Sequence, residues 1–382
     1  MYIPRLLEPE LKKRLQSPLN KVLILYGARQ TGKTTLLKRV VKDFDKIQWF
    51  DGDETETREL FARTSSAHFR AFFQPGAIVV IDEAQNIPGI GRKLKVIFDH
   101  LPDIRLLVSG SSSLDLADAV SEPLTGRKIT YNLYPLAFEE MVQFHGLFEE
   151  MRRLEHRLLY GYYPGIVTAP VEDAVSFLKE LTASYLYKDI LIWNKIRKPD
   201  KLIRLLQALA LRTGQQVSYH ELGEITGLDN ETVESYIDLL EKSFVIYRLM
   251  PFSRNLRNEL KRTRKIYFYD TGVRNALINN FNPLNLRQDT GMLWENFLIT
   301  ERLKFLSYHH IHANIYFWRT HNGQEIDYVE ERNGKLYAYE FTWLPKKKKK
   351  IPKTFLENYP VAEAKIIHKD NFVSFILPEK ID

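Results

Sequence analysis

A glycine-containing loop between an apolar run and a helical pattern sets the first limit on how this 382-residue chain folds. The run Lys-Val-Leu-Ile-Leu-Tyr at 21–26 is typical of a buried parallel strand, and residues 34–41 have helical spacing. The loop between them, Gly-Ala-Arg-Gln-Thr-Gly-Lys-Thr at 27–34, matches the pattern of a phosphate-binding loop. A chance match is the alternative, and the flanking strand and helix argue against it.

The residue types in this loop suit a phosphate ligand. Gly27 and Gly32 allow backbone conformations that a side chain would disfavour, so the N–H groups of the loop can point inward. The following helix offers its N-terminal N–H groups to the same anion. We therefore expect Lys33 to contact the β- and γ-phosphate oxygens and Thr34 to be a Mg²⁺ ligand.

A second motif ends another predicted strand. Residues 77–81 are Ala-Ile-Val-Val-Ile, and Asp82 and Glu83 follow them in the manner of a Walker B sequence. An Asp at the carboxyl end of a buried strand can hold Mg²⁺ through water, and the neighbouring Glu can orient or deprotonate an attacking water. The two motifs in this order predict a nucleoside triphosphate site.

Three further positions have a functional and a structural interpretation each. Ser109 and Ser111 follow the predicted strand at 104–108, where they could sense phosphate or only form a polar turn. Arg127 could reach a γ-phosphate as an arginine finger, within its own chain or from a neighbouring subunit. Arg29 contacts phosphate or only tethers the loop.

The alternation of strand-like and helix-like segments along the chain predicts an α/β fold. Strands at 21–26, 47–50, 77–81 and 104–108 alternate with helices, which indicates a P-loop parallel sheet with right-handed crossovers. The domains expected are a P-loop ATPase domain, a helical lid, a winged helix and a second, smaller nuclease-like α/β domain, at 1–145, 146–200, 201–250 and 251–382.

These residues resemble the archaeal and bacterial AAA-type ATPases of the STAND-related branch, in which a P-loop domain precedes a domain of unassigned function. The resemblance covers nearly the full chain, and its marks are the segments 27–35, 81–85, 109–113, 124–127, 134–140, 161–164, 265–272 and 294–297. It implies ATP as the nucleotide, with Mg²⁺, and ATP hydrolysis. The nucleotide-binding residues expected are Gly27, Ala28, Arg29, Gln30, Thr31, Gly32, Lys33, Thr34, Thr35, Asp82 and Ser109, and the catalytic residues are Glu83, Lys33 and Arg127.

The last region also resembles a PD-(D/E)XK nuclease-like fold. Asp327 and Glu340 fall on two strands joined by the hairpin signal Asn333-Gly334, and Glu295 falls on the preceding helix. Such carboxylates could hold Mg²⁺ for phosphodiester hydrolysis. The nuclease pattern expects a Lys two residues after the Glu, where this chain has Thr342. A lysine of the run 346–350 could replace it, although the spacing does not require this.

The winged helix and the charge distribution leave DNA binding open. The recognition helix expected at 230–242 presents an acidic face, whereas phosphate contacts need Lys and Arg, so a protein-packing role is favoured. Basic charge lies elsewhere, because residues 251–350 hold 18 Lys and Arg against 10 Asp and Glu. Six basic residues and one Glu at 254–265 could track a phosphate backbone or form a solvated loop.

The composition of the chain excludes several kinds of functional site. The absence of cysteine excludes a disulfide scaffold, a thiolate zinc site and a cysteine nucleophile. No run approaches the length of a membrane span, and the first residues lack a signal-peptide pattern, so a cytoplasmic location is expected. The function expected is a Mg²⁺-dependent ATPase that acts as a nucleotide-controlled switch. An ATP-regulated DNA-binding module without significant turnover, and a metal-dependent nuclease, are the alternatives.

Overall fold

The computed structural model describes residues 1–110, 124–185, 198–252, 263–345 and 349–378, and these form two compact units. Unit 1 comprises residues 1–135 and 242–244, and unit 2 comprises residues 136–241 and 245–382. The boundary at 135/136 lies ten residues before the one expected at 145/146. Helix α7 (Phe138–His145) belongs to unit 2 because the Phe138 N–H donates to Glu301 Oε2 at 2.7 Å, within that unit.

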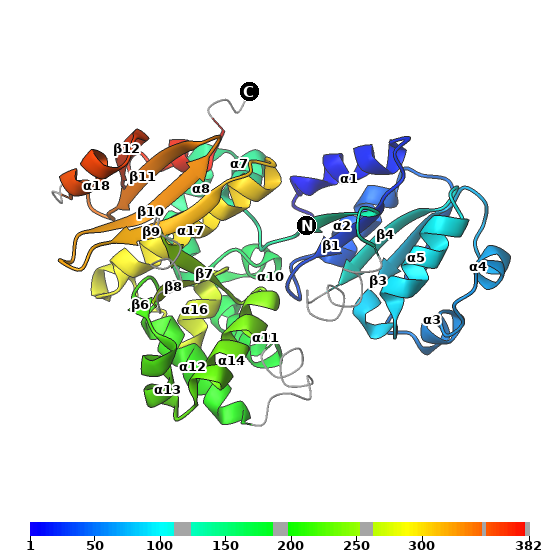
Figure 1. Ribbon diagram of the computed structural model, residues 1–382, viewed down its shortest axis with the longest axis horizontal. Coiled ribbons are helices and arrows are strands. Elements are labelled where there is room, and N and C mark those ends of the chain that lie inside the picture. The colour runs from blue at the N-terminus through cyan, green and yellow to red at the C-terminus, as the bar shows by residue number, and fades with distance from the viewer. Residues whose placement is uncertain (111–123, 186–197, 253–262, 346–348, 379–382) are drawn as a thin grey trace. The chain divides into compact units, whose positions relative to one another are not determined.

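Unit 1 is built on a parallel sheet in the strand order β2-β3-β4-β1-β5 (Figure 1). The strands are β1 (Val22–Tyr26), β2 (Ile47–Asp51), β3 (Ile78–Asp82), β4 (Arg105–Gly110) and β5 (Lys128–Asn132). All five residues of β1 and of β3 are buried, as expected of a sheet covered on both faces. The α/β class and the parallel P-loop sheet expected from the sequence are confirmed.

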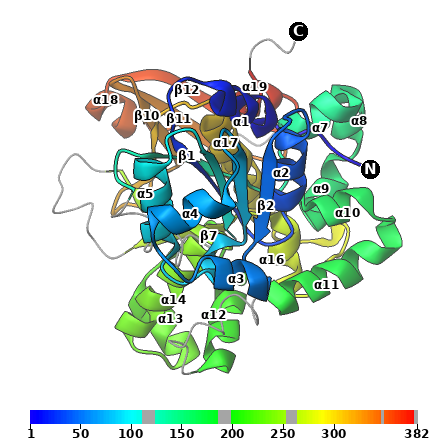
Figure 2. The ribbon, with the colours of Figure 1, turned by 90° about the vertical axis from the view of Figure 1, so that its right-hand side faces the viewer.

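The helices of unit 1 connect these strands. They are α1 (Leu7–Gln16), α2 (Lys33–Val41), α3 (Thr55–Leu60), α4 (Ser66–Phe72) and α5 (Ile90–His100), with the 3-10 turn η1 (Ala84–Asn86). Helix α2 connects β1 to β2 and α5 connects β3 to β4, and these two crossovers run in opposite directions along the sheet. Right-handed crossovers of opposite direction must use opposite faces, and α2 and α5 indeed lie on opposite sides of the strands (Figure 2).

Unit 2 contains a second sheet, whose strand order is β12-β11-β10-β9-β7-β8-β6. Its strands are β6 (Gln216–Val217), β7 (Ile246–Pro251), β8 (Arg264–Phe268), β9 (Asn314–Arg319), β10 (Glu325–Arg332), β11 (Lys335–Phe341) and β12 (Val361–Ile367). The β7–β9 and β11–β12 pairs are parallel and the other pairs are antiparallel. A single mixed sheet therefore runs through the two regions expected as separate domains at 201–250 and 251–382.

The described helices of unit 2 surround this sheet. They are α7 (Phe138–His145), α8 (Leu147–Arg152), α9 (Leu154–Tyr160), α10 (Pro164–Thr168), α11 (Ala174–Tyr185), α12 (Pro199–Leu211), α13 (Tyr219–Thr226), α14 (Asn230–Lys242), α16 (Thr271–Leu277), α17 (Thr290–Tyr308), α18 (Lys353–Asn358) and α19 (Val373–Ile376). Two 3-10 turns, η2 (Val171–Asp173) and η4 (Leu284–Leu286), join some of them.

Local sequence signals explain several element ends in unit 2. The Ser218 hydroxyl accepts the Glu221 N–H at 3.1 Å and so caps α13, as the sequence predicts. The turn between β10 and β11 is formed by Asn333 and Gly334, both at positive φ, which is the geometry expected of an Asn-Gly hairpin. Unit 2 combines the regions expected as the helical lid, the winged helix and the second, smaller α/β domain at 251–382.

Candidate functional site

The predicted phosphate-binding loop joins β1 to α2 at the carboxyl edge of the unit 1 sheet. Strand β1 ends at Tyr26, and α2 begins at Lys33 directly after Gly32, whose φ is +93°. A side chain at Gly32 would be strained in this left-handed conformation. A Cβ atom on Gly27 would lie 2.3 Å from the backbone oxygen of Leu133, so Gly27 is required by close packing. The conformational role expected of both glycines therefore holds for Gly32, whereas Gly27 is required by packing.

The Lys33 ammonium is held inside this loop. The side chain is only 4% exposed, and Nζ donates to the backbone oxygens of Gly27 and Ala28, both at 3.1 Å. It also lies 3.9 Å from Glu83 Oε1. A buried cation at the N-terminus of a nine-residue helix with no acidic residue in its first turn is an arrangement suited to an anion.

The acidic motif lies at the ends of the neighbouring strands. Strand β4 separates β1 from β3, so Ser109 on β4 lies between the loop strand and Asp82 at the end of β3. Asp82 is 2% exposed, and its Oδ1 accepts a short hydrogen bond from the Ser109 hydroxyl. The same oxygen accepts the Glu83 N–H at 3.2 Å. The three predicted residues therefore form one hydrogen-bonded group.

Glu83 has an unusual backbone conformation. Its φ of 45° and ψ of 43° place a residue with a side chain in the left-handed region, which costs free energy and is found mostly at functional sites. The Gln85 amide donates to Glu83 Oε2 at 2.5 Å, and Oε1 is the atom that faces Lys33. Glu83 is thus fixed at the strand end, with its carboxylate between an amide and the loop lysine.

The remaining loop residues differ in exposure. Thr31 is buried, and its hydroxyl donates to the Ala28 oxygen at 2.8 Å. Thr34, the predicted Mg²⁺ ligand, is partly buried in the first turn of α2, whereas Thr35 is exposed. Gln30 is exposed at φ 60° and Arg29 is partly buried. Their roles toward a nucleotide stay predictions.

Arg5 is a part of this region that the sequence analysis missed. Its guanidinium donates to the backbone oxygens of Thr31 and Tyr134, both at 2.7 Å, and the side chain is only 5% exposed. The acceptors are 26 and 129 residues away along the chain. No motif spacing could have indicated this contact.

Arg127 is not brought to the loop of its own chain. Its backbone oxygen accepts the Val22 N–H at 2.9 Å, beside the first residue of β1, and Arg127 directly precedes β5. Since β1 and β5 are parallel, this is the amino edge of the sheet, and the phosphate-binding loop lies at the carboxyl edge. The side chain pairs with Asp99 Oδ1 at 2.8 Å. This placement argues against the alternative in which Arg127 acts within its own chain, and action from a neighbouring subunit stays a prediction.

The carboxylates of the predicted second site are bridged by lysines. Lys349 Nζ lies 2.7 Å from both Asp327 Oδ2 and Glu340 Oε2, and Lys265 Nζ lies 3.1 Å from Glu295 Oε1 and 3.8 Å from Asp327 Oδ1. Within the described ranges no group of three or more His, Asp or Glu side chains is placed to hold a metal. Glu295, Asp327 and Glu340 thus form an ion-pair network, which corrects the expected metal site.

Burial shifts the pKa values of two carboxyl groups in this network. It raises the pKa of Glu340 to about 8, with the Asp327 charge adding to the effect and Lys349 opposing it. Burial likewise raises the pKa of Glu295 to about 7, against the attraction of Lys265. Lys349 occupies the place of the lysine missing at Thr342, whose side chain instead donates to the Leu344 oxygen at 3.1 Å. Glu340 and Lys349 are nine positions apart in the sequence, and no motif spacing indicates their contact.

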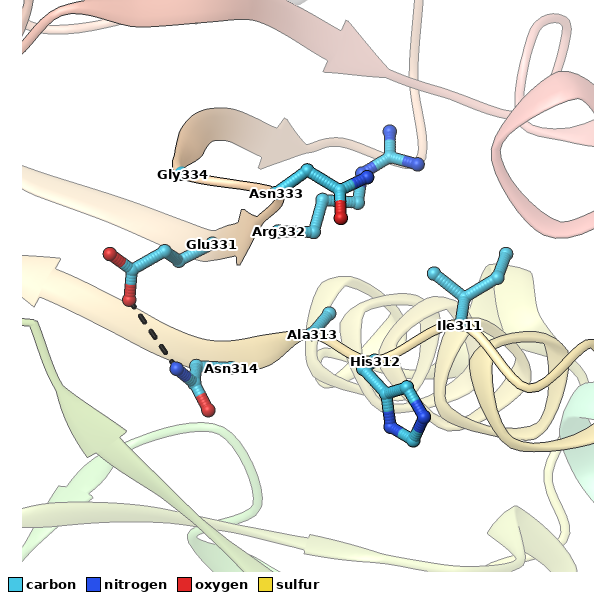
Figure 3. A pocket seen from close by; sticks show the side chains of 8 residues that line it. All are labelled: Ile311, His312, Ala313, Asn314, Glu331, Arg332, Asn333 and Gly334. Carbon is cyan, nitrogen blue, oxygen red and sulfur yellow. Dashed lines mark hydrogen bonds between the residues drawn. The ribbon is translucent and has the colours of Figure 1, made fainter.

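A hollow of about 510 Å³ lies beside the β10–β11 turn, away from every predicted site residue (Figure 3). Its lining residues come from the segment before β9, from the first residue of β9 and from the β10–β11 hairpin, and they are Ile311, His312, Ala313, Asn314, Glu331, Arg332, Asn333 and Gly334. The Asn314 amide donates to Glu331 Oε2 at 3.4 Å across it. We assign it no chemistry.

Two expectations fall outside the described residues. Ser111 and most of the basic segment 254–265 lie there, as do three residues of the lysine run 346–350. In the part of the chain that is described, none of the helices has the length and apolar character needed to cross a bilayer.

Comparison with known families supports the assignment of the first unit. Residues 19–142 match the family model described as an AAA domain, which supports a P-loop ATPase domain there. Residues 151–284 and 290–375 match two models that are each described as a domain of unknown function. These matches assign no activity to unit 2.

Relatives occur in bacteria and archaea. An uncharacterized protein of Mycobacterium tuberculosis is 28% identical over 332 residues, which cover 86% of this chain and 72% of the relative. Uncharacterized proteins of Methanocaldococcus jannaschii and Haemophilus influenzae are 22% and 23% identical, over 71% and 67% of this chain and 65% and 69% of their own lengths. A solved Walker-type ATPase of Pyrococcus abyssi is 17% identical, with a TM-score of 0.48, over 71% of this chain and 94% of its own.

Proposed function

We propose that this chain binds ATP with Mg²⁺, hydrolyses it, and uses the nucleotide state as a switch. The observation that carries the proposal is the hydrogen-bonded group of Asp82, Ser109 and Glu83 beside the buried Lys33 ammonium. Four side chains from three neighbouring strand ends meet where the AAA domain match also predicts nucleotide. ATP as the nucleotide rests on the family resemblance.

The donor set fits a magnesium–phosphate ligand. Mg²⁺ prefers carboxylate and hydroxyl oxygens and retains several waters, and the buried Asp82 carboxylate and the Thr34 hydroxyl are oxygen donors of this type. The N-terminus of α2, preceded by Gly32, provides backbone N–H groups that no side chain of the cap residue engages. Bound Mg²⁺–ATP would supply the phosphoanhydride bond whose cleavage by water is the reaction.

The residues of the chain would divide the work. Lys33 stabilises negative charge on the phosphate oxygens, because its ammonium is already fixed inside the loop. Glu83 orients the attacking water and accepts its proton, while the Gln85 amide holds the other carboxylate oxygen. Ser109 keeps Asp82 in one orientation.

Phosphate release in the presence of Mg²⁺ tests the proposal. Lys33→Ala should abolish turnover, and Glu83→Gln should retain ATP binding while losing about 10²–10⁴-fold in kcat. Lys38→Ala on the exposed side of α2 and Glu56→Gln on α3 are matched controls that should leave turnover unchanged. Equal turnover in the wild type and both site variants would exclude this site.

We also infer that the described elements from α12 to β8 form the winged helix expected at 201–250. The element order α12, β6, α13, α14, β7, β8 and the antiparallel order β7-β8-β6 support this inference. The exposed residues of α14 include Glu231 and Glu234, and Asp238 pairs with Arg248 at 2.7 Å. This acidic helix does not favour a phosphate backbone as its ligand. Repeating the phosphate-release assay with and without DNA at low salt tests the DNA alternative directly.

A further inference from the structure

We propose that Arg5 is a positioning residue that couples the phosphate-binding loop to the segment through which the chain leaves unit 1. The inference rests on the proposed function, because it names the route by which nucleotide at the loop would act on the rest of the chain. Three sets of contacts carry it, two within unit 1 and one within unit 2.

The first contact is the fork made by Arg5 itself. Its Nη1 donates to the Thr31 oxygen and its Nη2 to the Tyr134 oxygen, both at 2.7 Å. Both acceptors are backbone carbonyls, so the guanidinium is bound to the main chain at both positions and not to side chains. Because the guanidinium is planar and rigid, it holds the two carbonyls at a fixed separation. A displacement of the loop at Thr31 is therefore passed to Tyr134.

The second contact joins the other end of the loop to the same segment. The Leu133 N–H donates to the Tyr26 oxygen at 2.7 Å. The Leu133 oxygen lies so close to Gly27 that a Cβ there would come within 2.3 Å. Residues 133–134 thus touch the loop at its first glycine and, through Arg5, near its last.

The third set of contacts fixes the chain just beyond Pro135, within unit 2. The Leu136 N–H donates to the Tyr162 oxygen at 2.9 Å, and the Leu136 oxygen accepts from Lys304 Nζ at 2.8 Å. Glu301 accepts the Phe138 N–H at 2.7 Å and pairs with the same lysine at 2.7 Å. Both Lys304 and Glu301 are buried, so this anchor is rigid.

Pro135 therefore separates two anchored stretches of main chain. The ring of a proline fixes its φ angle, so the main chain between Tyr134 and Leu136 has fewer free dihedral angles. If Tyr134 moves together with the loop, Leu136 and its contacts with Lys304 must also move. Arg5 contributes to this route through its two hydrogen bonds to backbone oxygens, and for that reason we call it a positioning residue.

Distance measurement between the two units tests the inference. The chain has no cysteine, so spin labels at Lys42→Cys in unit 1 and Glu357→Cys in unit 2 would be unique, and both positions are exposed. All measurements use Glu83→Gln as the parent protein, because this variant should bind ATP without hydrolysing it. In the otherwise unaltered protein we expect ATP to shift the interlabel distance distribution. In Arg5→Ala that shift should disappear, while ATP affinity falls by less than about tenfold because both hydrogen bonds lie outside the nucleotide.

Two further variants keep the test decisive if Arg5→Ala folds poorly. Arg5→Lys retains the charge but not the rigid fork, so it should reduce the ATP-dependent shift. Arg14→Ala removes a partly exposed arginine of α1 that pairs with Glu10 at 2.7 Å, and it should leave the shift intact. Absence of ATP binding in the unaltered protein would remove the proposed function itself. ATP binding with an unchanged shift in both Arg5 variants, or with no shift in the parent, would overturn the role of Arg5 alone.

Discussion

Substitution of Gly27 by alanine tests the packing of the phosphate-binding loop most directly. The added methyl group would lie 2.3 Å from the Leu133 oxygen and 3.2 Å from the Thr31 hydroxyl. The first separation is far below any ordinary contact, and the neighbour is backbone held by the Leu133–Tyr26 hydrogen bond. Either the loop or the end of β5 must therefore move.

The expected cost is that of overpacking a closely packed site, about 1–3 kcal/mol of the free energy of unfolding of unit 1. Each 1 kcal/mol lowers Tm by about 2–8 °C for domains between 60 and 250 residues. Because the displaced atoms belong to the loop, we also expect ATP affinity to fall by at least about tenfold. Thermal unfolding and titration with a fluorescent ATP analogue measure the two effects.

The matched control is Gly291→Ala in the first turn of α17. This glycine is exposed, and nothing lies within 4 Å of the position of its Cβ. Alanine is the better helix former, so this variant should retain or gain stability, by up to about 1 kcal/mol, with unchanged ATP affinity. A Gly27→Ala protein with the Tm and affinity of the wild type would refute the reasoning, since it would show that residues 133–134 yield freely.

Three other predictions concern charge. The raised pKa of Glu340, about 8 because of burial, means that the folded protein binds more protons than the unfolded chain between pH 4.5 and 8. This group therefore makes stability fall as pH rises through that window, and Glu340→Gln should flatten the decline in urea midpoint between pH 5.5 and 8.5. Arg302→Met should lower the free energy of unfolding by about 3 kcal/mol, because the buried Glu330 carboxylate loses its bidentate partner, which donates to it twice at 2.9 Å. The double variant Arg302→Met/Glu330→Gln should recover part of this loss, and urea unfolding measures both values. Arg127→Ala should leave ATP affinity unchanged in calorimetric titration, because its side chain lies at the opposite edge of the sheet; a loss of affinity would contradict that placement.

The part of the site that the sequence predicts is the part whose geometry is local. Strand ends at Tyr26, Ile81 and Val108 are visible as apolar runs, and parallel strands bring their carboxyl ends to one edge of the sheet. Lys33, Asp82 and Glu83 follow from that rule, and so does the place of Ser109 on the intervening strand.

The residues that were missed or misplaced depend on contacts distant in sequence. Arg5 meets Tyr134 across 129 residues, and Lys349 meets Asp327 across 22. Arg127 was placed near the phosphate from its position after a glycine, although it precedes β5 and hence lies at the amino edge. The compact units meet at 135/136 and not at 145/146, and the contact of Phe138 within unit 2 is with Glu301, far along the chain.

The parallel pairing of β7 with β9 has a consequence for dissecting this protein. Met250 and Pro251 lie opposite Tyr316 and Phe317, and Phe252 packs in one apolar cluster with Trp318 and Phe355. A fragment ending after residue 268 would retain β8 but leave the β9-facing edge of β7 unpaired and the Phe252 ring without its partners in this cluster, and open strand edges promote aggregation. Unit 2 should therefore be expressed and studied as one piece, and insoluble behaviour of a shorter fragment would reflect the cut sheet and not an unstable winged helix.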